Sequence, residues 1–494
     1  MKRLVGIAFL FGALAAHGQA ASEETITVDA SAPAQPFPHF WEQMFGSGRA
    51  VLSLRDSYRK DLRAVRDITG FQYIRFHAIL DDDIGVYDED AQGNAIYNFS
   101  YVDQIYDGLL ENNIRPFVEL SFMPRKLALN LTPHAFWYKP FPSPPKDPAK
   151  WAALIAAFTN HLIERYGKDE VEKWYFEVWN EPNIDFWNGK PQQETYFQLY
   201  DLTAKAVKQV DSKLRVGGPA TAQAAWVGDF IAHCTQNHVP FDFVSTHVYG
   251  NDTAQDVFGK SMQIARRDMV ARAAKKVYDQ VKSSAAPNTP IFWSEYNATY
   301  MNQQEVTDSP FMGPWLANNI RECDGLTAMM SYWSFSDVFE EQGVVKTPFY
   351  GGYGLLAERD IPKAAFRDFE LLHRLGDRRL AADSENALVT EGPKGQIVIA
   401  LWNYAEPGEA VEGKTFKLAL RNADFRLYRM QSVAPGTGSS LEAWKKLGSP
   451  ALPTLQQIHQ LITESGLAPA RTAPISEPIV LGPQTLAVIE LIRR

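Results

Sequence analysis

The sequence predicts an α/β protein in which an eight-stranded (β/α)8 TIM barrel is followed by a C-terminal antiparallel β-sandwich. Apolar strands of the kind that are buried on both faces alternate with amphipathic helices over residues 39–376. Two of these strands, the fourth and the seventh, end in a glutamate. From residue 377 to 494 the chain changes to short strands separated by Gly, Pro and Asn turns, which is typical of a sandwich.

The first 20 residues have the pattern of a secretory signal peptide. Lys2 and Arg3 precede a short apolar run, and Gly18-Gln19-Ala20 supplies the small residues of a cleavage site. The run is too short to anchor the chain in a bilayer. We therefore expect residues 1–20 to be removed and the mature chain to be exported to the periplasm or the medium, with no membrane attachment.

Composition narrows the class of protein further. The chain has 494 residues, 45% of them hydrophobic, and this is enough for a large core and more than one domain. A net charge of −9 without a basic block makes nucleic acid an improbable partner. No Cys/His cluster has zinc spacing and no Gly-rich phosphate loop is present, so no metal or cofactor is expected. Oligomeric state stays open.

The two cysteines, Cys234 and Cys323, have two possible states. An exported chain could join them in a disulfide. A domain of this size needs no such cross-link, so we expect two buried free thiols.

The barrel strands are predicted from runs of aromatic and β-branched residues. A Pro- and aromatic-rich loop over 129–148 is longer than a barrel usually needs, and loops of that kind tend to be functional. The expected strands are 39–45, 71–77, 114–120, 174–179, 214–217, 241–249, 290–299 and 325–333.

The helices between them are predicted from apolar residues at helical spacing. In the first helix these are Tyr58, Leu62, Val65 and Ile68. Glycine ends two of the helices, as it commonly does. The expected helices are 56–70, 101–112, 149–167, 194–210, 229–236, 261–283 and 361–375.

The C-terminal strands predict a sandwich that the N-terminal segment joins. Residues 21–38 contain one strand, 25–28, which could be an extra member. A helical insertion is expected at 454–465. No planar row of exposed aromatic residues is visible, so we expect a packing partner for the barrel rather than a polysaccharide-binding module. The expected strands are 387–390, 396–403, 415–420, 425–430, 479–481 and 486–491.

Glu181 and Glu295 each follow a buried strand. In a parallel barrel the carboxyl ends of the strands carry the chemistry. Two glutamates at that end are what acid-assisted cleavage of a glycosidic bond requires. Alternatively, each glutamate caps a turn or pairs with an arginine.

At Trp179-Asn-Glu-Pro-Asn183 and Trp293-Ser-Glu-Tyr296 the chain resembles retaining glycoside hydrolases of the large barrel clan. More narrowly, it resembles glycoside hydrolase family 39, which contains β-xylosidases and α-L-iduronidases. Thr246-His-Val-Tyr249 and the stretch 332–341 also match, and the resemblance covers nearly the whole mature chain. It implies that Glu181 is the general acid/base and Glu295 the nucleophile.

The resemblance also implies a set of sugar-binding residues. Asn180 can bind the sugar 2-hydroxyl, and Tyr249 is a candidate donor to Glu295. The chain departs from the family at one position, since the family usually has glycine where this chain has Ala78. An alternative also stands: a histidine or tryptophan at a strand end can simply belong to the core. The candidate sugar-binding residues are His77, Asn180, His247, Tyr249, Trp333, Glu340 and Glu341, with Phe186 and Trp187 at the mouth.

The expected activity is that of an exported, retaining, exo-acting β-D-xylosidase that releases xylose from xylo-oligosaccharides. An α-L-iduronidase is the alternative within the family, but its substrate carboxylate would be repelled by Glu340 and Glu341. Arabinofuranosidase activity on the same scaffold is a further alternative. A non-catalytic carbohydrate-binding protein would have lost one of the two glutamates, and both are present.

Overall fold

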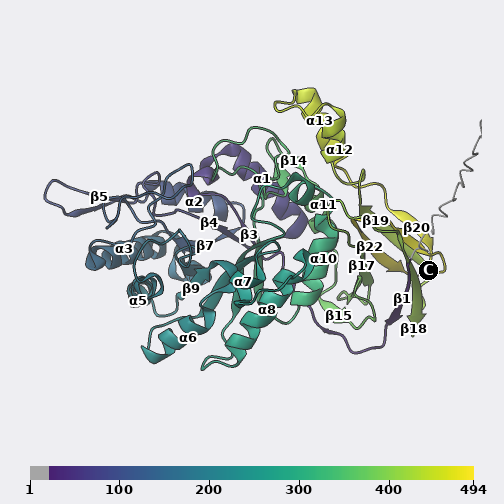
Figure 1. Ribbon diagram of the computed structural model, residues 1–494, viewed down its shortest axis with the longest axis horizontal. Helices are drawn as coiled ribbons and strands as arrows, with labels where there is room; N and C mark the ends of the chain where they lie inside the picture. The colour runs from purple at the N-terminus through teal and green to yellow at the C-terminus, as the bar shows by residue number, and fades with distance from the viewer. Residues whose placement is uncertain (1–21, 494) are drawn as a thin grey trace, which may run out of the picture.

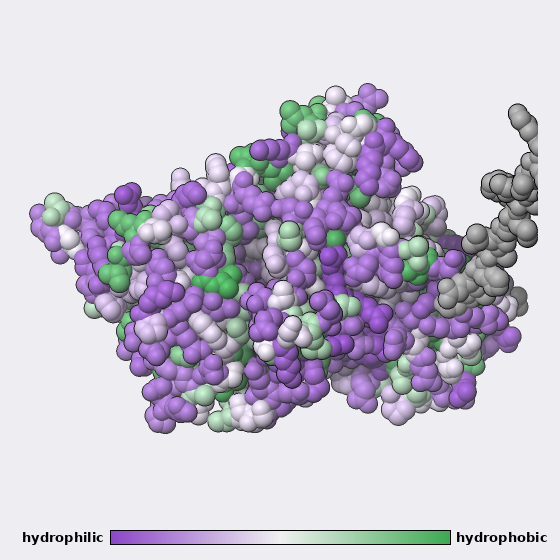
Figure 2. Space-filling model, in the orientation of Figure 1, coloured by the Kyte–Doolittle hydropathy of each residue, from purple (hydrophilic) through white to green (hydrophobic). Residues whose placement is uncertain are grey.

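The computed structural model describes residues 22–493, so the predicted signal peptide lies outside the described residues. Figure 1 shows a barrel surrounded by helices beside a smaller part built of sheets, with β1 among the C-terminal strands. The face in Figure 2 is largely hydrophilic, with small, separate hydrophobic patches. No helix in the described part of the chain is both long and apolar enough to cross a membrane.

Eight parallel strands close into a barrel, which confirms the predicted fold class. The last strand, β12, pairs with the first, β3, through Ser331–Met44 and Tyr332–Phe45. All eight carboxyl ends therefore open at the same end of the barrel. In order around the barrel the strands are β3 (Met44–Gly46), β4 (Tyr73–Phe76), β7 (Arg115–Leu120), β8 (Tyr175–Val178), β9 (Arg215–Thr221), β10 (Phe243–Tyr249), β11 (Ile291–Asn297) and β12 (Met329–Tyr332).

The helices that follow these strands have local start and stop signals. Gly70, with φ 66°, ends the first helix in the left-handed conformation that glycine favours. The Asp147 side chain accepts hydrogen bonds from the backbone N–H groups of Ala149 and Lys150 and begins the third. The main helices are α1 (Asp56–Thr69), α2 (Ser100–Leu110), α3 (Pro148–Tyr166), α5 (Gln192–Val210), α6 (Val227–Gln236), α8 (Arg266–Lys282), α10 (Met312–Cys323) and α11 (Ala364–Leu372).

Three predicted boundaries are corrected by the structure. The first barrel strand begins at Met44, because residues 39–43 form turns. Helix α8 begins at Arg266 rather than at 261, and residues 261–265 before it are largely exposed. The closing helix begins at Ala364, because Ile361–Pro362 (β14) pairs with Leu356–Ala357 (β13).

The C-terminal part contains a seven-stranded and a three-stranded sheet. Its pairs are antiparallel except one: β1 runs parallel to β18, so the sandwich is mixed rather than purely antiparallel. Helices α12 (Leu441–Lys446) and α13 (Leu455–Glu464) form the insertion. The sheets consist of β2 (Gln35–Pro36), β15 (Arg378–Leu380), β16 (Ala387–Glu391), β17 (Ile397–Asn403), β22 (Thr485–Ile492), β19 (Leu427–Val433) and β20 (Arg471–Pro474), and of β1 (Ser22–Asp29), β18 (Lys414–Arg421) and β21 (Ile479–Leu481).

Strand β17 is buried on both faces and joins the two parts. Ile399 and Leu401 point into the core between the two sheets. Val398, Ala400 and Trp402 alternate with them and belong to the barrel core, where α10 and α11 contact the seven-stranded sheet. The sandwich is thus packed against the barrel through one face of the central strands β17, β22 and β19 of its larger sheet.

The inside of the barrel is built in two layers that the same strands supply. We call the first the apolar layer; it lies toward the amino ends of the strands and consists of Met44, Tyr73, Phe117, Tyr175, Phe243, Phe292 and Met329. The second, the ionic layer, lies toward the carboxyl ends and consists of Arg75, Glu119, Glu177 and Glu295. Side chains two positions apart on a strand point the same way, so Arg75, Glu119 and Glu177 face inward as the apolar layer does. Glu295 is three positions after Phe292, and an irregularity in β11 lets both face inward.

Cys234 on α6 and Cys323 on α10 are buried free thiols, which confirms the prediction. Burial raises the pKa of each thiol. Neither is therefore a reactive thiolate near neutral pH.

Candidate active site

The two glutamates meet at the carboxyl end of the barrel. After β8 ends at Val178, Trp179 (φ 75°) and Glu181 (φ 44°) turn through left-handed backbone conformations that non-glycine residues rarely adopt. Glu295 lies within β11. One carboxylate oxygen of each glutamate and Nδ1 of His247 all lie within 4.8 Å of one another. Carboxyl groups about 5 Å apart are those of retaining glycosidases, whereas inverting enzymes keep them about 6.5–9.5 Å apart.

A cavity of about 410 Å³ lies over this pair. Its size falls within the range of sites for small molecules. Most of the residues predicted as sugar ligands line it together with the two glutamates: His77, Asn180, Phe186, Tyr249, Trp333 and Glu341.

Glu295 has the donor that the sequence predicted and one that it did not. The Tyr249 hydroxyl donates to Oε2 at 2.7 Å. Arg75 donates through Nη1 to Oε1, also at 2.7 Å. A phenol and a guanidinium thus orient this carboxylate and balance its charge.

Arg75 is the main residue that sequence reasoning missed. It is fully buried and also donates to Glu177 at 2.6 Å and to the amide oxygen of Asn180 at 3.0 Å. The Asn180 amide NH2 group therefore remains available to the cavity. The only sequence signal was a charged residue in the middle of an apolar strand, and such a residue is rarely buried without a partner.

His77 is held by a second carboxylate of the ionic layer. Its Nδ1 lies 2.7 Å from Glu119 Oε2, and its Nε2 lies 3.7 Å from both Glu295 and Glu341. Burial lowers the pKa of His77, but Glu119 and Glu295 together more than offset this, so the pKa is raised. The next residue, Ala78, has φ 70°, which explains why glycine suits this position in the resembled family.

The two adjacent acids of the strand-eight loop, Glu340 and Glu341, lie in different environments. Glu341 lines the cavity, and burial raises its pKa to about 8. Glu340 does not line it; Arg55 Nη1 lies 2.7 Å and Arg49 Nη2 3.5 Å from its carboxylate. The structure therefore places Glu341 in the cavity and Glu340 outside it, paired with two arginines.

His247 and Trp187 are also placed differently from the prediction, since neither lines the cavity. His247 is fully buried; its Nδ1 lies 3.0 Å from Glu181 Oε1 and its Nε2 3.0 Å from the Ser294 hydroxyl. Trp187 is 1% exposed and donates to the Thr195 hydroxyl. His247 therefore contacts Glu181, and Trp187 packs against Trp179 and Tyr196.

The surroundings of Glu181 favour its neutral form. Burial raises its pKa well above the ordinary value, and the charges of Glu295 and Asp252 raise it further. Burial also lowers the pKa of His247 well below its usual range, so this imidazole brings no positive charge. Asp252, whose pKa burial raises to about 7, lines the cavity and was not predicted.

The loop over residues 129–148 forms one wall of the cavity through His134 and Phe136. His134 stacks on Phe186 with ring centroids 4.1 Å apart. The backbone N–H of Trp137 donates to the carbonyl of Glu341 at 2.8 Å, so this loop and the strand-eight loop are joined. The unusual length of the loop was the signal for its role.

Glu181, His247 and Glu295 are close enough to bind a cation, but Arg75 makes the position unfavourable. Its guanidinium already occupies Glu295 Oε1 at 2.7 Å, and a cation there would lie beside a fixed positive charge. The arrangement is better suited to acid–base chemistry on one bond, with a neutral acid on one side and an oriented carboxylate on the other.

The comparisons with known proteins agree with this chemistry. The sequence profile of glycosyl hydrolases family 39 matches residues 24–479. The chain is 38% identical over 438 residues to a beta-xylosidase of Geobacillus stearothermophilus, covering 86% of each chain. It is 37% identical over 440 residues to a beta-xylosidase of Caldicellulosiruptor saccharolyticus, covering 87% of this chain and 88% of the relative.

The fold agrees as well. A crystal structure of a monomeric beta-xylosidase from Caulobacter crescentus CB15 superposes with a TM-score of 0.86 at 32% identity, covering 95% of this chain and 99% of that one. A profile match over nearly the whole chain and relatives of this identity and coverage establish the family. The chain therefore belongs to glycosyl hydrolases family 39 and is a glycoside hydrolase.

Proposed function

We propose that this glycoside hydrolase is an exported, retaining β-D-xylosidase that releases xylose from the non-reducing ends of xylo-oligosaccharides. The observation that carries the proposal is the pair Glu181 and Glu295, whose carboxylate oxygens lie within 4.8 Å of each other under a cavity of about 410 Å³. The beta-xylosidases to which the chain is 37–38% identical support xylose as the released sugar.

In the first step Glu295 attacks the anomeric carbon while the glycosidic C–O bond breaks. The proton of Glu181 moves to the departing oxygen. Because the pKa of Glu181 is raised, this residue keeps its proton at higher pH than an ordinary glutamate does. The donors Arg75 and Tyr249 hold the Glu295 carboxylate for attack.

In the second step water replaces the enzyme on the anomeric carbon. Formation of the glycosyl ester removes the negative charge of Glu295, which had raised the pKa of Glu181. Glu181 can then take a proton from water as the new C–O bond forms and the Glu295 carboxylate leaves. Two inversions give net retention of the anomeric configuration.

Exo-action is supported by the wall that the loop 129–148 and the strand-eight loop build together. The hydrogen bond from Trp137 to Glu341 closes the space between them, and Trp137 also packs against Gly343. A chain end can enter such a cavity, whereas a long chain would have to pass through the joined loops.

The chemistry of the cavity favours a neutral sugar over an iduronate. No lysine or arginine is among the described residues that line it, whereas the acids Asp252 and Glu341 are. A substrate carboxylate would therefore lack the arginine or lysine partner that such groups usually have.

The test is a panel of nitrophenyl glycosides compared by kcat/KM, with Glu295→Ala as the blank. We expect the β-xyloside to exceed the β-glucoside, α-arabinofuranoside, α-arabinopyranoside and α-iduronide. Comparable values for the xyloside and glucoside, or a preference for the iduronide, would refute the assignment of xylose.

Two further measurements test the rest of the proposal. NMR should show β-xylose as the first product; α-xylose would refute retention. Xylohexaose should lose single xylose units, whereas early xylobiose or xylotriose would refute exo-action. If the protein is found in the cytoplasmic fraction of the native host, export is refuted.

A further inference from the structure

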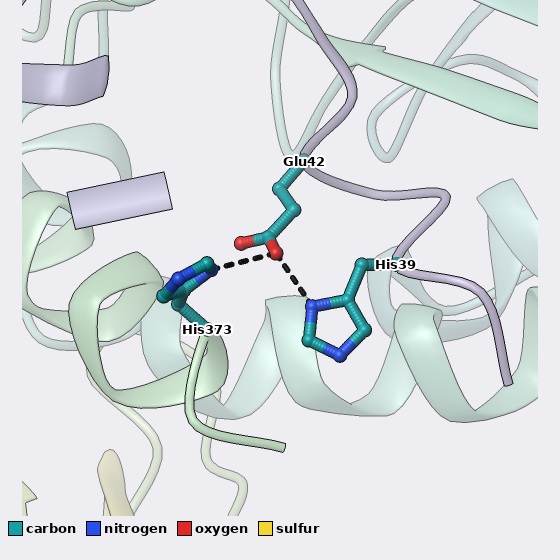
Figure 3. A group of neighbouring side chains, drawn as sticks. All are labelled: His39, Glu42 and His373. Carbon is teal, nitrogen blue, oxygen red and sulfur yellow. Dashed lines mark hydrogen bonds and ion pairs between the residues drawn. The ribbon is translucent and has the colours of Figure 1, made fainter. Parts of the chain in front are cut away.

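We propose that His39, Glu42 and His373 form a binding site for one Zn²⁺ ion at the end of the barrel opposite the active site. We call these three residues the His–Glu–His cluster. Figure 3 shows Glu42 between the two imidazoles, with both rings facing the same carboxylate oxygen. Nothing in the proposed hydrolysis uses these residues, so the site goes beyond the proposed function.

The three side chains present their ligand atoms to a common point. His39 Nδ1 lies 2.5 Å and His373 Nδ1 2.8 Å from Glu42 Oε1. All three ligand atoms lie within 4.8 Å of one another. Two imidazole nitrogens and one carboxylate are a ligand set that binds Zn²⁺ and leaves a fourth position for water.

The second carboxylate oxygen is an independent sign of a missing partner. Glu42 is 4% exposed, and its Oε2 is buried without a hydrogen-bond partner among residues 22–493. Most buried polar atoms in proteins are paired, and an unpaired carboxylate oxygen is destabilising. A cation held by the two histidines would give this carboxylate a counter-charge and Oε2 a possible ligand role.

The geometry needs only a small adjustment to take the ion. Ligands about 2.0 Å from a tetrahedral Zn²⁺ lie roughly 3.3 Å from one another, so the two nitrogens must move away from Glu42 by less than about 1 Å. The His373 side chain is 46% exposed and directly follows α11, so it has room to move. Its exposure also gives the ion and a water ligand access from solvent.

The position of the cluster predicts what the ion would do. Glu42 precedes β3, and the neighbouring Phe40 accepts a hydrogen bond from Met330 of β12 at 2.9 Å. His373 lies where the closing helix ends. A shared ion would therefore join the first strand to the last helix and stabilise the closed barrel, while kcat/KM on a β-xyloside stays unchanged.

The experiment titrates the mature, chelator-treated protein with Zn²⁺ by calorimetry, and with Co²⁺ as a visible-absorption probe. We expect one ion per chain, a tetrahedral Co²⁺ spectrum, and a rise in Tm of roughly 2–5 °C at about 100-fold excess over Kd. Activity is measured in the same samples.

His373→Ala and Glu42→Gln should each weaken binding by about tenfold or more and reduce the rise in Tm by about half or more. The matched control is His233→Ala, because His233 also pairs with one carboxylate, Asp201, at 2.8 Å but lacks a second histidine. It should bind Zn²⁺ as the wild type does. Unchanged circular dichroism and kcat/KM would show that each variant is folded.

Three results would overturn the site. The first is no Zn²⁺ binding by the wild type, which would leave a hydrogen-bonded clamp only. The second is binding that His373→Ala and Glu42→Gln do not weaken. The third is inhibition of hydrolysis in proportion to bound Zn²⁺, which would place the ion at the active site instead.

Discussion

The apolar and ionic layers of the barrel lie only two positions apart on β4, β7 and β8, and three positions apart on β11. Tyr73 is followed two residues later by Arg75, and Phe117 by Glu119. Each pair points inward, yet one member contributes to packing and the other to a network of buried charges. The same backbone thus supports stability in one layer and chemistry in the next.

Substitutions in the two layers should affect the protein for different physical reasons. Burying a side chain such as Phe117 stabilises the fold by about 1.5–3 kcal/mol through the hydrophobic effect. Burying Arg75 and its carboxylates is favourable only while every charge is paired. Substitutions in the ionic layer should therefore affect activity and stability together, and those in the apolar layer should affect stability alone.

The largest effect is expected within the catalytic pair. Glu295→Ala should lower kcat by about 10⁴-fold or more on every xyloside, since no other group can form the bond to the anomeric carbon. Glu181→Ala should still form the glycosyl-enzyme from an activated aryl xyloside and then stall, giving a burst followed by slow turnover with a low apparent KM. Pre-steady-state kinetics measures both.

Azide provides the control for these roles. It should restore turnover of Glu181→Ala and give β-xylosyl azide, because a small anion needs no base. With Glu295→Ala it should give the α-azide. If Glu181→Ala is equally inactive on activated and unactivated xylosides and azide has no effect, Glu181 is not the acid/base.

The second prediction compares one substitution from each layer. Arg75→Met should lower the free energy of unfolding by about 3–5 kcal/mol, because it leaves buried carboxylates unpaired, and should also lower kcat/KM by about 100-fold or more. Phe117→Ala should lower it by a similar 3–5 kcal/mol through the cavity that it creates. Its folded fraction should keep kcat/KM within about threefold of wild type.

Urea unfolding and initial rates, corrected for the folded fraction, measure these outcomes. Equal losses of kcat/KM in the two variants would contradict the separation of the layers. Full activity in Arg75→Met would show that Tyr249 alone suffices to orient Glu295.

The third prediction divides the adjacent acids of the strand-eight loop. Glu341→Gln should lower kcat/KM by up to about tenfold, the effect of one hydrogen bond. Glu340→Gln should change kcat/KM by less than about threefold and only weaken the pairing with Arg55. Steady-state kinetics on a β-xyloside decides between them, and a larger loss in Glu340→Gln would restore the role that the sequence predicted for it.

The smallest effect concerns pH. The proposed reaction needs protonated Glu181, so activity is lost as pH rises through the pKa of this residue. The negative charge of Asp252 raises that pKa, so Asp252→Asn should move the basic limb of kcat/KM toward lower pH. Because burial raises the pKa of Asp252 to about 7, the two profiles should converge below about pH 6, where Asp252 is neutral.

The control for this shift is Asp229→Asn, an exposed acid on α6 that does not line the cavity. It should leave the profile of kcat/KM against pH unchanged. A basic limb that moves upward in Asp252→Asn, or not at all, would show that Asp252 does not act on Glu181.

The sequence by itself determined the barrel, the sandwich and the positions of Glu181 and Glu295. They can be predicted because apolar residues repeat at short, regular intervals along strands and helices. In addition, the last side chain of a strand in a parallel barrel lies at the same end as those of its neighbours. The Tyr249–Glu295 contact followed from the same rule, since β10 and β11 are adjacent and parallel.

Only the tertiary structure decided how the charges are paired. Arg75 meets Glu177 and Glu295, which lie 102 and 220 residues away, and no local pattern encodes such distances. Glu340 and Glu341 point in different directions. An irregular loop has no regular alternation of side chains, so the available partners decide the direction of each. The His–Glu–His cluster joins residues 331 positions apart and forms only when the barrel closes.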